Sequence, residues 1–359
     1  MSPQRPTLKH AMATGLALCG AVAVAACSGS SGAAGGGASA LPAKAQNAAP
    51  TLGLGNPSPS LCKGKHYTIG YDSFSDSQPF AVSVSNDLSA AAKKMGCVTL
   101  TKVVDNADPQ TALANVRTLV GEHVNGVILF QILDAAQPQI ARTLKQAAIP
   151  GVATAVNAPG LPFVSDSDYH AGYQAGQHLG QAYQAKHPGG VLPYLIVGGR
   201  PEGGPVDKQR AQGIADGVKS VLAGLPESHI QVIDSNALQD AAYTQTLSAL
   251  SRVPAGSPVL LSGENEEVVL GMYRAAQQRG RKDLLVMGLG GDATGLKEVC
   301  TQPDYVGTVQ FFPEHWGGWL LPAIIAQINN TGLPQTVTIP TAVQTKPDIQ
   351  KTYPTVPCQ

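Results

Sequence analysis

The stretch YTIGYDSFSDSQPFAVSVSNDLSAAAKKMGCVTLTKVV, residues 67–104, decides the fold class of this 359-residue chain. Its β-branched and apolar residues predict strands over residues 67–72 and 97–104. Between these strands, apolar residues near helical spacing predict a helix over residues 80–94, which Gly96 ends. A strand, a helix and a strand in this order indicate a βαβ unit with parallel strands.

The alternation of strand and helix continues to about residue 329. Asp108 and Pro109 open the next helix, and the apolar run Val127-Ile-Leu-Phe130 predicts a strand buried on both faces. A second series starts with a helix over residues 169–186. Two such series predict an α/β fold with two doubly wound, Rossmann-like lobes, which bind ligands at the carboxyl ends of their parallel strands.

The first 26 residues have the features of an export signal. Arg5 and Lys9 precede an uncharged run of residues 11–26, which is shorter than the ~20 residues of a membrane-spanning helix. The run ends at Cys27, in a setting that resembles the lipobox of bacterial lipoproteins. This resemblance implies that Cys27 carries lipid and that the exported protein is anchored to the outer face of the cell membrane.

The composition of residues 27–60 predicts a flexible tether. Beyond Cys27 they are mostly Gly, Ser, Ala and Pro, and Lys44 is their one charged residue. The whole chain has 24 basic and 24 acidic residues. This balance leaves no basic surface of the kind that nucleic-acid binding requires, so we expect no nucleic-acid partner.

Four cysteines remain for the folded part of an exported chain. An even number without a C-x-x-C spacing favours disulfides over a zinc site. Four cysteines allow three pairings, and two free buried thiols are the alternative to the bonds. Parallel neighbouring strands would bring the first two together, so we favour the pairs Cys62–Cys97 and Cys300–Cys358.

No group of residues predicts catalysis, a cofactor or a metal. The glycine-rich residues 288–293 follow a strand, but no clear acidic partner lies about 20 residues on, so we interpret them as a strand-to-helix turn. The eight histidines include no HExxH pair, and the chain has no G-x-S-x-G motif. Glu264, Glu266 and Glu267 are interpreted as acidic residues favoured at the start of a helix rather than as an acid–base pair.

Several motifs, in the right order, resemble the ribose- and galactose-type periplasmic binding proteins, the receptors of sugar ABC importers. They are a polar loop that ends in Pro79-Phe80, the run Arg210-Ala-Gln-Gly213-Ile214, Asn265-Glu-Glu267 with Leu270-Gly271, and Met287-Gly288. The resemblance covers nearly all of residues 65–344. It implies the type I periplasmic-binding-protein fold, whose two lobes are joined by a three-strand hinge.

With this fold, we expect the chain to cross between the lobes near residues 165–168, 310–313 and 333–337. The N-terminal lobe would comprise residues 61–166 and 311–335, and the C-terminal lobe residues 167–310 and 336–359.

The resemblance also implies ligand-binding residues. Phe80 stands where the family stacks sugar on an aromatic ring, and Asn265 matches a polar pocket position. The Asp-Arg pair common after the fourth strand is here Ala155-Val156. Because charged groups that hold adjacent hydroxyls are missing, we expect a sugar-like or partly apolar ligand. The candidate ligand-binding residues are Phe80, Gln131, Asn157, Lys208, Asn265, Asp292, Gln310 and Phe311.

Trp316 and Trp319 are interpreted as packing residues. The leading hypothesis is a monomeric, lipid-anchored solute-binding protein that delivers its ligand to an ABC transporter permease. The alternatives are a ligand-sensing receptor for a membrane kinase and an exported enzyme on the same fold.

Overall fold

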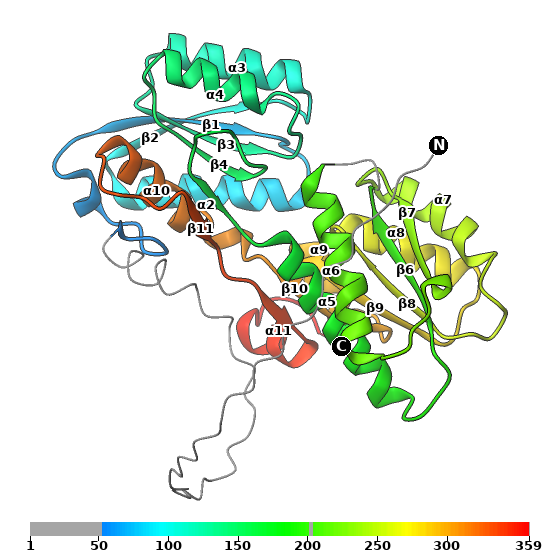
Figure 1. Ribbon diagram of the computed structural model, residues 1–359. Coiled ribbons are helices and arrows are strands. Elements are labelled where there is room, and N and C mark those ends of the chain that lie inside the picture. The colour runs from blue at the N-terminus through cyan, green and yellow to red at the C-terminus, as the bar shows by residue number, and fades with distance from the viewer. Residues whose placement is uncertain (1–51, 201–203, 359) are drawn as a thin grey trace, which may run out of the picture. The chain divides into compact units, whose positions relative to one another are not determined.

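The computed structural model describes residues 52–200 and 204–358, which form two parallel-dominated α/β lobes (Figure 1). The predicted signal peptide and the lipidation candidate Cys27 lie outside the described residues. Among the residues described, no helix is long and apolar enough to cross a membrane.

The first lobe is built on a six-stranded sheet in the order β11-β5-β4-β3-β1-β2, with all its pairs parallel. Its order reverses at β1, as in a doubly wound sheet. The strands are β1 (Tyr67–Ser73), β2 (Val98–Val104), β3 (Gly126–Gln131), β4 (Gly151–Ala155), β5 (Phe163–Ser165) and β11 (Thr336–Thr338). Its helices are α2 (Pro79–Met95), α3 (Pro109–Gly121), α4 (Gln137–Gln146) and α10 (Gly317–Ile328).

The second lobe repeats the arrangement, in the order β12-β10-β9-β8-β6-β7, with β12 antiparallel to β10. The strands are β6 (Tyr194–Gly199), β7 (Ile230–Asp234), β8 (Val259–Gly263), β9 (Leu284–Gly290), β10 (Tyr305–Gln310) and β12 (Ala342–Gln344). The helices are α5 (Asp168–Lys186), α6 (Pro205–Val221), α7 (Gln239–Leu250), α8 (Glu266–Gln278), α9 (Ala293–Thr301) and α11 (Lys346–Thr352).

The central strands β3, β4, β8 and β9 are buried along their whole length, which explains their apolar sequences. In β3, Val127 and Leu129 pack with α3 and α4 on one face, while Ile128 and Phe130 point to α2 and α10 on the other. The predicted two-lobed α/β fold is thereby confirmed.

Close contact between α5 and α6 depends on glycine. A Cβ on Gly176 would lie 2.0 Å from the Ile214 carbonyl oxygen, and one on Gly213 would lie 2.2 Å from the Tyr169 carbonyl oxygen. Only a residue without a side chain permits this backbone approach. The tight pairing fixes the start of α6, which carries Arg210, against the start of α5.

The third crossing comes later in the chain than expected. β11 pairs with β5 in the first sheet, and β12 pairs with β10 in the second, so the chain crosses between Thr338 and Ala342. The expected crossing at residues 333–337 and the expected lobe boundary at residue 335 are corrected accordingly. The reason is that Val337 is buried in the first lobe's core.

Part of the expected tether is folded. Leu52 and Leu54 are buried in the same core cluster as α2 and α10, and the Gly55 amide donates to the Gly318 carbonyl at 2.8 Å. A short 3₁₀ helix, η1 (Pro59–Cys62), follows. Residues 52–60 therefore belong to the first lobe, because their leucines have apolar surface to bury against α10.

Two disulfides join the favoured cysteine pairs, Cys62–Cys97 and Cys300–Cys358. The first links η1 to the residue before β2. The second links the end of α9 to the C-terminal segment that follows α11. The predicted pairing is confirmed.

Candidate functional site

A pocket of about 540 Å³ lies between the carboxyl ends of the two sheets. Its first-lobe wall includes Phe74, Phe80, Phe130 and Leu133. Among the described residues that line this wall, none carries a formal charge. The charged lining residues come from the second lobe, and they are Arg200, Asp207, Arg210, Glu264, Glu266, Glu267 and Asp292.

Phe80 reaches the pocket from the first turn of α2. Pro79 begins this helix, and the Gln78 side chain accepts a hydrogen bond from the Ala81 amide at 2.9 Å. The Phe80 ring meets Trp316 edge-on at 5.3 Å and Phe311 at 6.0 Å between centroids. Phe80 is thus a half-buried ring with rigid aromatic support.

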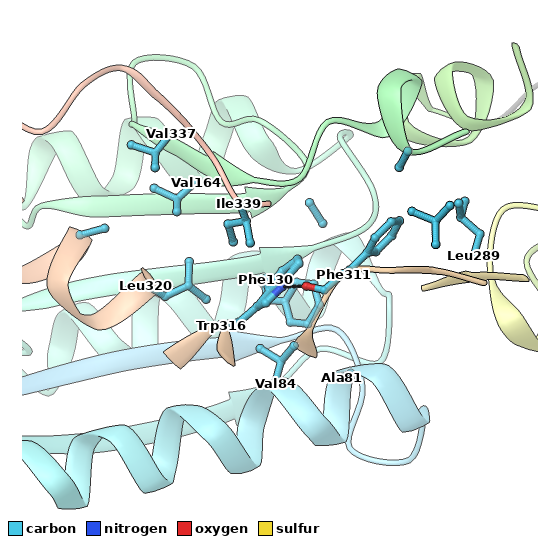
Figure 2. Close-up of a cluster of buried hydrophobic side chains, with 14 of the residues drawn as sticks. Ala81, Val84, Phe130, Val164, Leu289, Phe311, Trp316, Leu320, Val337 and Ile339 are labelled. Atoms are coloured by element: carbon cyan, nitrogen blue, oxygen red, sulfur yellow. Dashed lines mark hydrogen bonds between the residues drawn. The ribbon is translucent and has the colours of Figure 1, made fainter. Parts of the chain in front are cut away.

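The three rings that contact Phe80 are buried core residues. Figure 2 shows Phe130, Phe311 and Trp316 together between the first sheet and α2. Trp316 is 1% exposed, and its indole N–H donates to the Phe311 carbonyl at 2.7 Å. Trp316 therefore acts in packing, as predicted, although one edge of it reaches the pocket wall.

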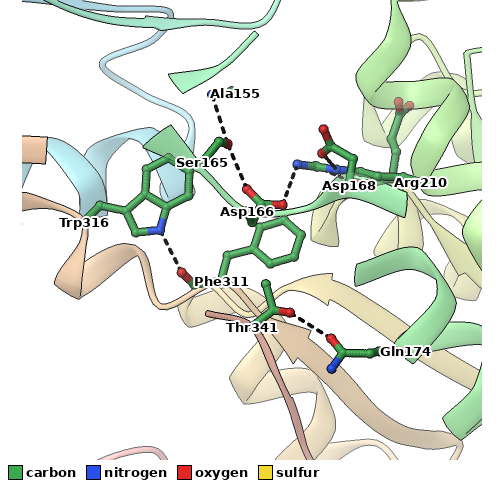
Figure 3. Close-up of polar contacts among 10 residues, drawn as sticks. Ala155, Ser165, Asp166, Asp168, Gln174, Arg210, Phe311, Trp316 and Thr341 are labelled. Carbon is green, nitrogen blue, oxygen red and sulfur yellow. Dashed lines mark hydrogen bonds and ion pairs between the residues drawn. The ribbon is translucent and has the colours of Figure 1, made fainter. Parts of the chain in front are cut away.

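Arg210 links α6 to two crossings of the hinge (Figure 3). Its Nε donates to Asp168 Oδ1 at 2.8 Å, and its Nη2 lies 3.7 Å from Asp166 Oδ2. Its Nη1 donates to the Glu264 carbonyl at 2.9 Å, and its guanidinium lies 4.8 Å from the centre of the Phe311 ring. Burial raises the pKa of Asp168, and Arg210 opposes this by favouring the carboxylate.

Glu264 follows β8 and is 2% exposed. Its Oε1 accepts a hydrogen bond from the Ser235 hydroxyl. Burial, and next a side-chain hydrogen bond with the Asp207 carboxyl, raise the pKa of Glu264 to about 8. Glu264 is therefore a buried carboxyl group on the pocket wall that favours its protonated form.

Glu266 lies in the first turn of α8, and it occupies space left by two glycines. A Cβ on Gly295 would lie 2.1 Å from its carboxyl carbon, and one on Gly288 would lie 2.5 Å from its Oε2. Its Oε1 accepts hydrogen bonds from the Gly291 amide at 2.8 Å and from the Thr308 hydroxyl. Burial, and then Asp292, raise the pKa of Glu266 to about 8. Glu266 lies at the start of α8 as predicted, whereas Glu264 precedes the N-cap residue Asn265. Both are buried residues that line the pocket.

Residues 69–332 match the model of a family described as periplasmic binding protein domain. The chain belongs to this family. This periplasmic binding protein is 28% identical over 208 residues to a xylitol-binding protein of Mycolicibacterium smegmatis. The alignment covers 56% of each protein, so the chain spans about half the length of that relative.

Solved structures share the fold of this periplasmic binding protein. An ABC transporter solute-binding protein of Actinobacillus succinogenes 130z with bound D-allose has a TM-score of 0.69 at 16% identity, covering 79% of this chain and 99% of its own. An ABC transporter solute-binding protein of Bacillus halodurans C-125 with bound myo-inositol has a TM-score of 0.68 at 15% identity. This match covers 80% of this chain and 97% of the other. Structural similarity at these low sequence identities shows that the chain has the type I fold.

Four of the candidate residues predicted from the sequence line the pocket of this periplasmic binding protein: Phe80, Asn265, Asp292 and Phe311. Asn265 caps α8, because its Oδ1 accepts from the Val268 amide at 2.8 Å, and its Nδ2 donates to the Ala237 carbonyl at 3.3 Å. Asp292 caps α9 in the same way. Their contacts with a ligand stay predictions.

The other four candidates are not among the described residues that line the pocket: Gln131, Asn157, Lys208 and Gln310. Asn157 and Lys208 are exposed. Gln310 is buried, and its Nε2 donates to the Tyr353 hydroxyl at 2.5 Å and to Glu314 at 3.3 Å. The ligand contacts of these four residues also stay predictions.

Gln131 is held by two buried carboxyl groups of the first sheet. Its Nε2 donates to Asp72 Oδ2 at 3.0 Å and to Asp105 Oδ2 at 2.6 Å. Burial, and then Asp105, raise the pKa of Asp72 to about 8, and burial raises the pKa of Asp105 to about 6. The amide therefore joins the ends of β1, β2 and β3.

Sequence reasoning missed Arg210 and Glu264 as parts of the site. Arg210 begins the run 210–214 that resembles the family, and Glu264 directly precedes Asn265, which the resemblance placed in the pocket. Within residues 52–200 and 204–358, no group of three or more His, Cys, Asp or Glu could hold a metal ion.

Proposed function

We propose that this chain is an extracytoplasmic solute-binding protein that captures a small sugar-like or partly apolar ligand and delivers it to an ABC importer. The observation that carries the proposal is the pocket between the lobes, with Phe80 from the first lobe and Asn265 from the second on its wall. The ligands named for the fold relatives, D-allose and myo-inositol, and the xylitol of the sequence relative support a polyol-like ligand.

Capture works by closure of the two lobes. The ligand's apolar face lies against Phe80, since the face of Phe311 is covered by Arg210. Its polar groups bond to Asn265 and the carboxyl groups of the second lobe. The crossings allow the lobes to rotate, and the closed outer surface is what the importer's permease recognises.

Export and anchoring complete the proposal. Cys27 follows a signal-like run and takes the lipid, which keeps the binding protein next to its permease. A Cys27→Ser variant should appear in the culture medium, whereas the natural chain should stay with the membrane fraction. Membrane association of both forms would contradict the anchor.

The ligand is tested by a thermal-shift panel that includes xylitol, D-allose, myo-inositol and other neutral polyols. A solute at about 100 times its Kd stabilises the folded protein by about 2.7 kcal/mol, which raises the melting temperature. Asn265→Ala should weaken each binding solute about tenfold or more. Thr345→Ala is the matched control, because it removes the N-cap residue of α11, which is not among the described residues that line the pocket.

If no solute shifts the melting temperature, the ligand class is wrong. If Asn265→Ala binds every hit as tightly as Thr345→Ala does, the placement of the ligand is wrong. Product formed from a hit by the purified protein would contradict a receptor role.

A further inference from the structure

The second crossing changes lobe within two residues, Phe311 and Phe312. The Phe311 amide donates to the Gly290 carbonyl at 3.0 Å, so the chain is bonded to the second sheet up to this point. The Phe311 carbonyl accepts from the Trp316 indole of the first lobe at 2.7 Å. Phe312 has a φ of 52°, a left-handed conformation that is unfavourable for a bulky residue. These two residues therefore form the pivot of the second crossing.

Two polar side chains flank this pivot, one on each lobe. Gln310 ends β10 and is fully buried, and it packs on Gly291, where an added Cβ would lie 2.5 Å from the Gln310 Cγ. Glu314 is half-buried in the 3₁₀ helix η3 (Pro313–His315), which precedes α10 of the first lobe. Because the pivot lies between them, rotation of the lobes must move Glu314 relative to Gln310.

The hydroxyl of Tyr353 joins these two side chains. It accepts a hydrogen bond from Gln310 Nε2 at 2.5 Å and donates one to Glu314 Oε1 at 2.5 Å. Gln310 Nε2 also donates to Glu314 Oε1, at 3.3 Å. Hydrogen bonds weaken steeply when their angle changes, so these bonds depend on one orientation of the lobes. We call Gln310, Glu314 and Tyr353 the hinge triangle.

Tyr353 is fixed to the second lobe. Its amide donates to the Ile349 carbonyl at 2.7 Å, and Ile349 is fully buried in the core of that lobe. The Tyr353 ring packs on the same core, and the Cys300–Cys358 disulfide holds the residues that follow it. The hydrogen bond from Tyr353 to Glu314 is therefore a bond between the two lobes.

The arrangement that the hinge triangle holds is an open one. On the pocket wall, Asn106 of the first lobe and Asn236 of the second lobe are exposed, and Leu238 is 54% exposed. A site that holds a small ligand buries most of the ligand's surface. Capture must therefore bring the two walls together by rotation at the crossings, which strains the hinge triangle.

We propose, on the basis of the proposed function, that Tyr353 is a positioning residue whose bond to Glu314 stabilises the open arrangement and so lowers the affinity for the ligand. Neither residue is among the described residues that line the pocket. The apparent Kd of a ligand that binds the closed form is its intrinsic Kd divided by the closed fraction. Loss of the Tyr353 hydroxyl raises the closed fraction and with it the affinity.

The test is Tyr353→Phe, which removes the hydroxyl and keeps the ring. Xylitol, D-allose and myo-inositol are titrated by calorimetry into the natural chain and into the variant. Each solute that binds the natural chain should bind Tyr353→Phe about fivefold more tightly. The melting temperature of the free variant should fall, because the open form loses hydrogen bonds. A merely structural role would lower the melting temperature without tightening the binding.

Tyr273→Phe is the matched control. The Tyr273 hydroxyl bonds to Asp304 at 3.1 Å and to Gln302 at 3.3 Å, all within the second lobe, so its loss should leave each affinity unchanged.

Glu314→Ala removes the partner of Tyr353 on the first lobe and should also tighten binding. The double variant Tyr353→Phe with Glu314→Ala should bind no more tightly than Glu314→Ala alone, because both changes break the same link. Gains that add in the double variant would overturn the proposed link.

The outcomes separate this inference from the proposed function. Equal or weaker binding by Tyr353→Phe would overturn the role of Tyr353 and leave the solute-binding function standing, as would an equal gain in Tyr273→Phe. If no solute of the panel binds, the proposed ligand class fails, and small-angle X-ray scattering of the ligand-free proteins decides the role of Tyr353. Tyr353→Phe should then have a smaller radius of gyration than Tyr273→Phe, and equal radii would overturn the inference.

Discussion

The guanidinium group of Arg210 lies 4.8 Å from the centre of the Phe311 ring, and its Nε donates to Asp168. Phe311 belongs to the second crossing between the lobes, and Asp168 follows the first. At the third crossing, the Thr341 hydroxyl donates to Gln174 of α5 at 2.8 Å (Figure 3). The paired helices α5 and α6 therefore hold all three crossings at the second lobe.

Loss of Arg210 should destabilise this end of the hinge. Arg210→Ala leaves Asp166 and Asp168 buried without their cation, so the free energy of unfolding should fall by about 3 kcal/mol in urea denaturation. Arg210→Lys should recover only part of the loss, because lysine lacks the fork of donors. The exposed Arg117→Ala serves as control, and an equal loss in both alanine variants would contradict the role of Arg210.

The contact between α5 and α6 should not tolerate a methyl group. In Gly176→Ala the new Cβ would lie 2.0 Å from a backbone oxygen, so the helices must separate, and the free energy of unfolding should fall by about 1–3 kcal/mol. Gly121→Ala, in the last turn of α3, meets nothing within 4 Å and should be neutral or stabilising by up to about 1 kcal/mol. Similar melting temperatures for the two variants would contradict the packing argument.

Removal of the second disulfide should loosen the C-terminal segment. This bond closes a loop of 58 residues, so the double variant Cys300→Ser with Cys358→Ser should lose about 4 kcal/mol of stability. Limited proteolysis followed by mass spectrometry should cut first after residue 345. Unchanged resistance of that segment would show that Ile349, buried in the core of the second lobe, holds it without the bond.

Stability should fall as pH rises from about 4 to 8, because Asp72 has a pKa of about 8 in the folded state, against about 4 when unfolded. In this range the folded state binds more protons than the unfolded state, so raising the pH favours unfolding. Asp72→Asn removes this group's share of the titration and should make the fall in melting temperature between pH 6 and 8 less steep. Glu264 and Glu266, with pKa values of about 8, account for the part of the fall that remains. A variant with the same pH slope as the natural chain would contradict burial as the cause.

Much of the fold could be predicted because its signals are local and repeated. Runs such as residues 127–130 indicate strands buried on both faces, and Gly96 and Asp108 mark helix boundaries. The third crossing was predicted a few residues too early, because β11 and β12 have three residues each, too few for a clear alternation. The folding of residues 52–60 was not predicted, because two leucines in a Gly- and Pro-rich segment give little local signal.

The site could be predicted only in part, because its other features depend on contacts between distant residues. Gln131 ends a central strand, as a ligand-binding residue would, but Asp72, 59 positions away, accepts its amide hydrogen. Glu266 stands in a helix's first turn, which is usually solvated, and is buried because Gly288 and Gly295 lack side chains. Phe80 and Asn265, which the family resemblance implied as binding residues, do line the pocket.

The most direct test of the account is a calorimetric titration of the best solute against the natural chain and Phe80→Leu. This change keeps an apolar side chain but removes the ring, so binding should weaken about tenfold. Phe163→Leu, in β5 outside the pocket, should bind as the natural chain does. Unchanged affinity in Phe80→Leu would contradict ligand capture between the two lobes.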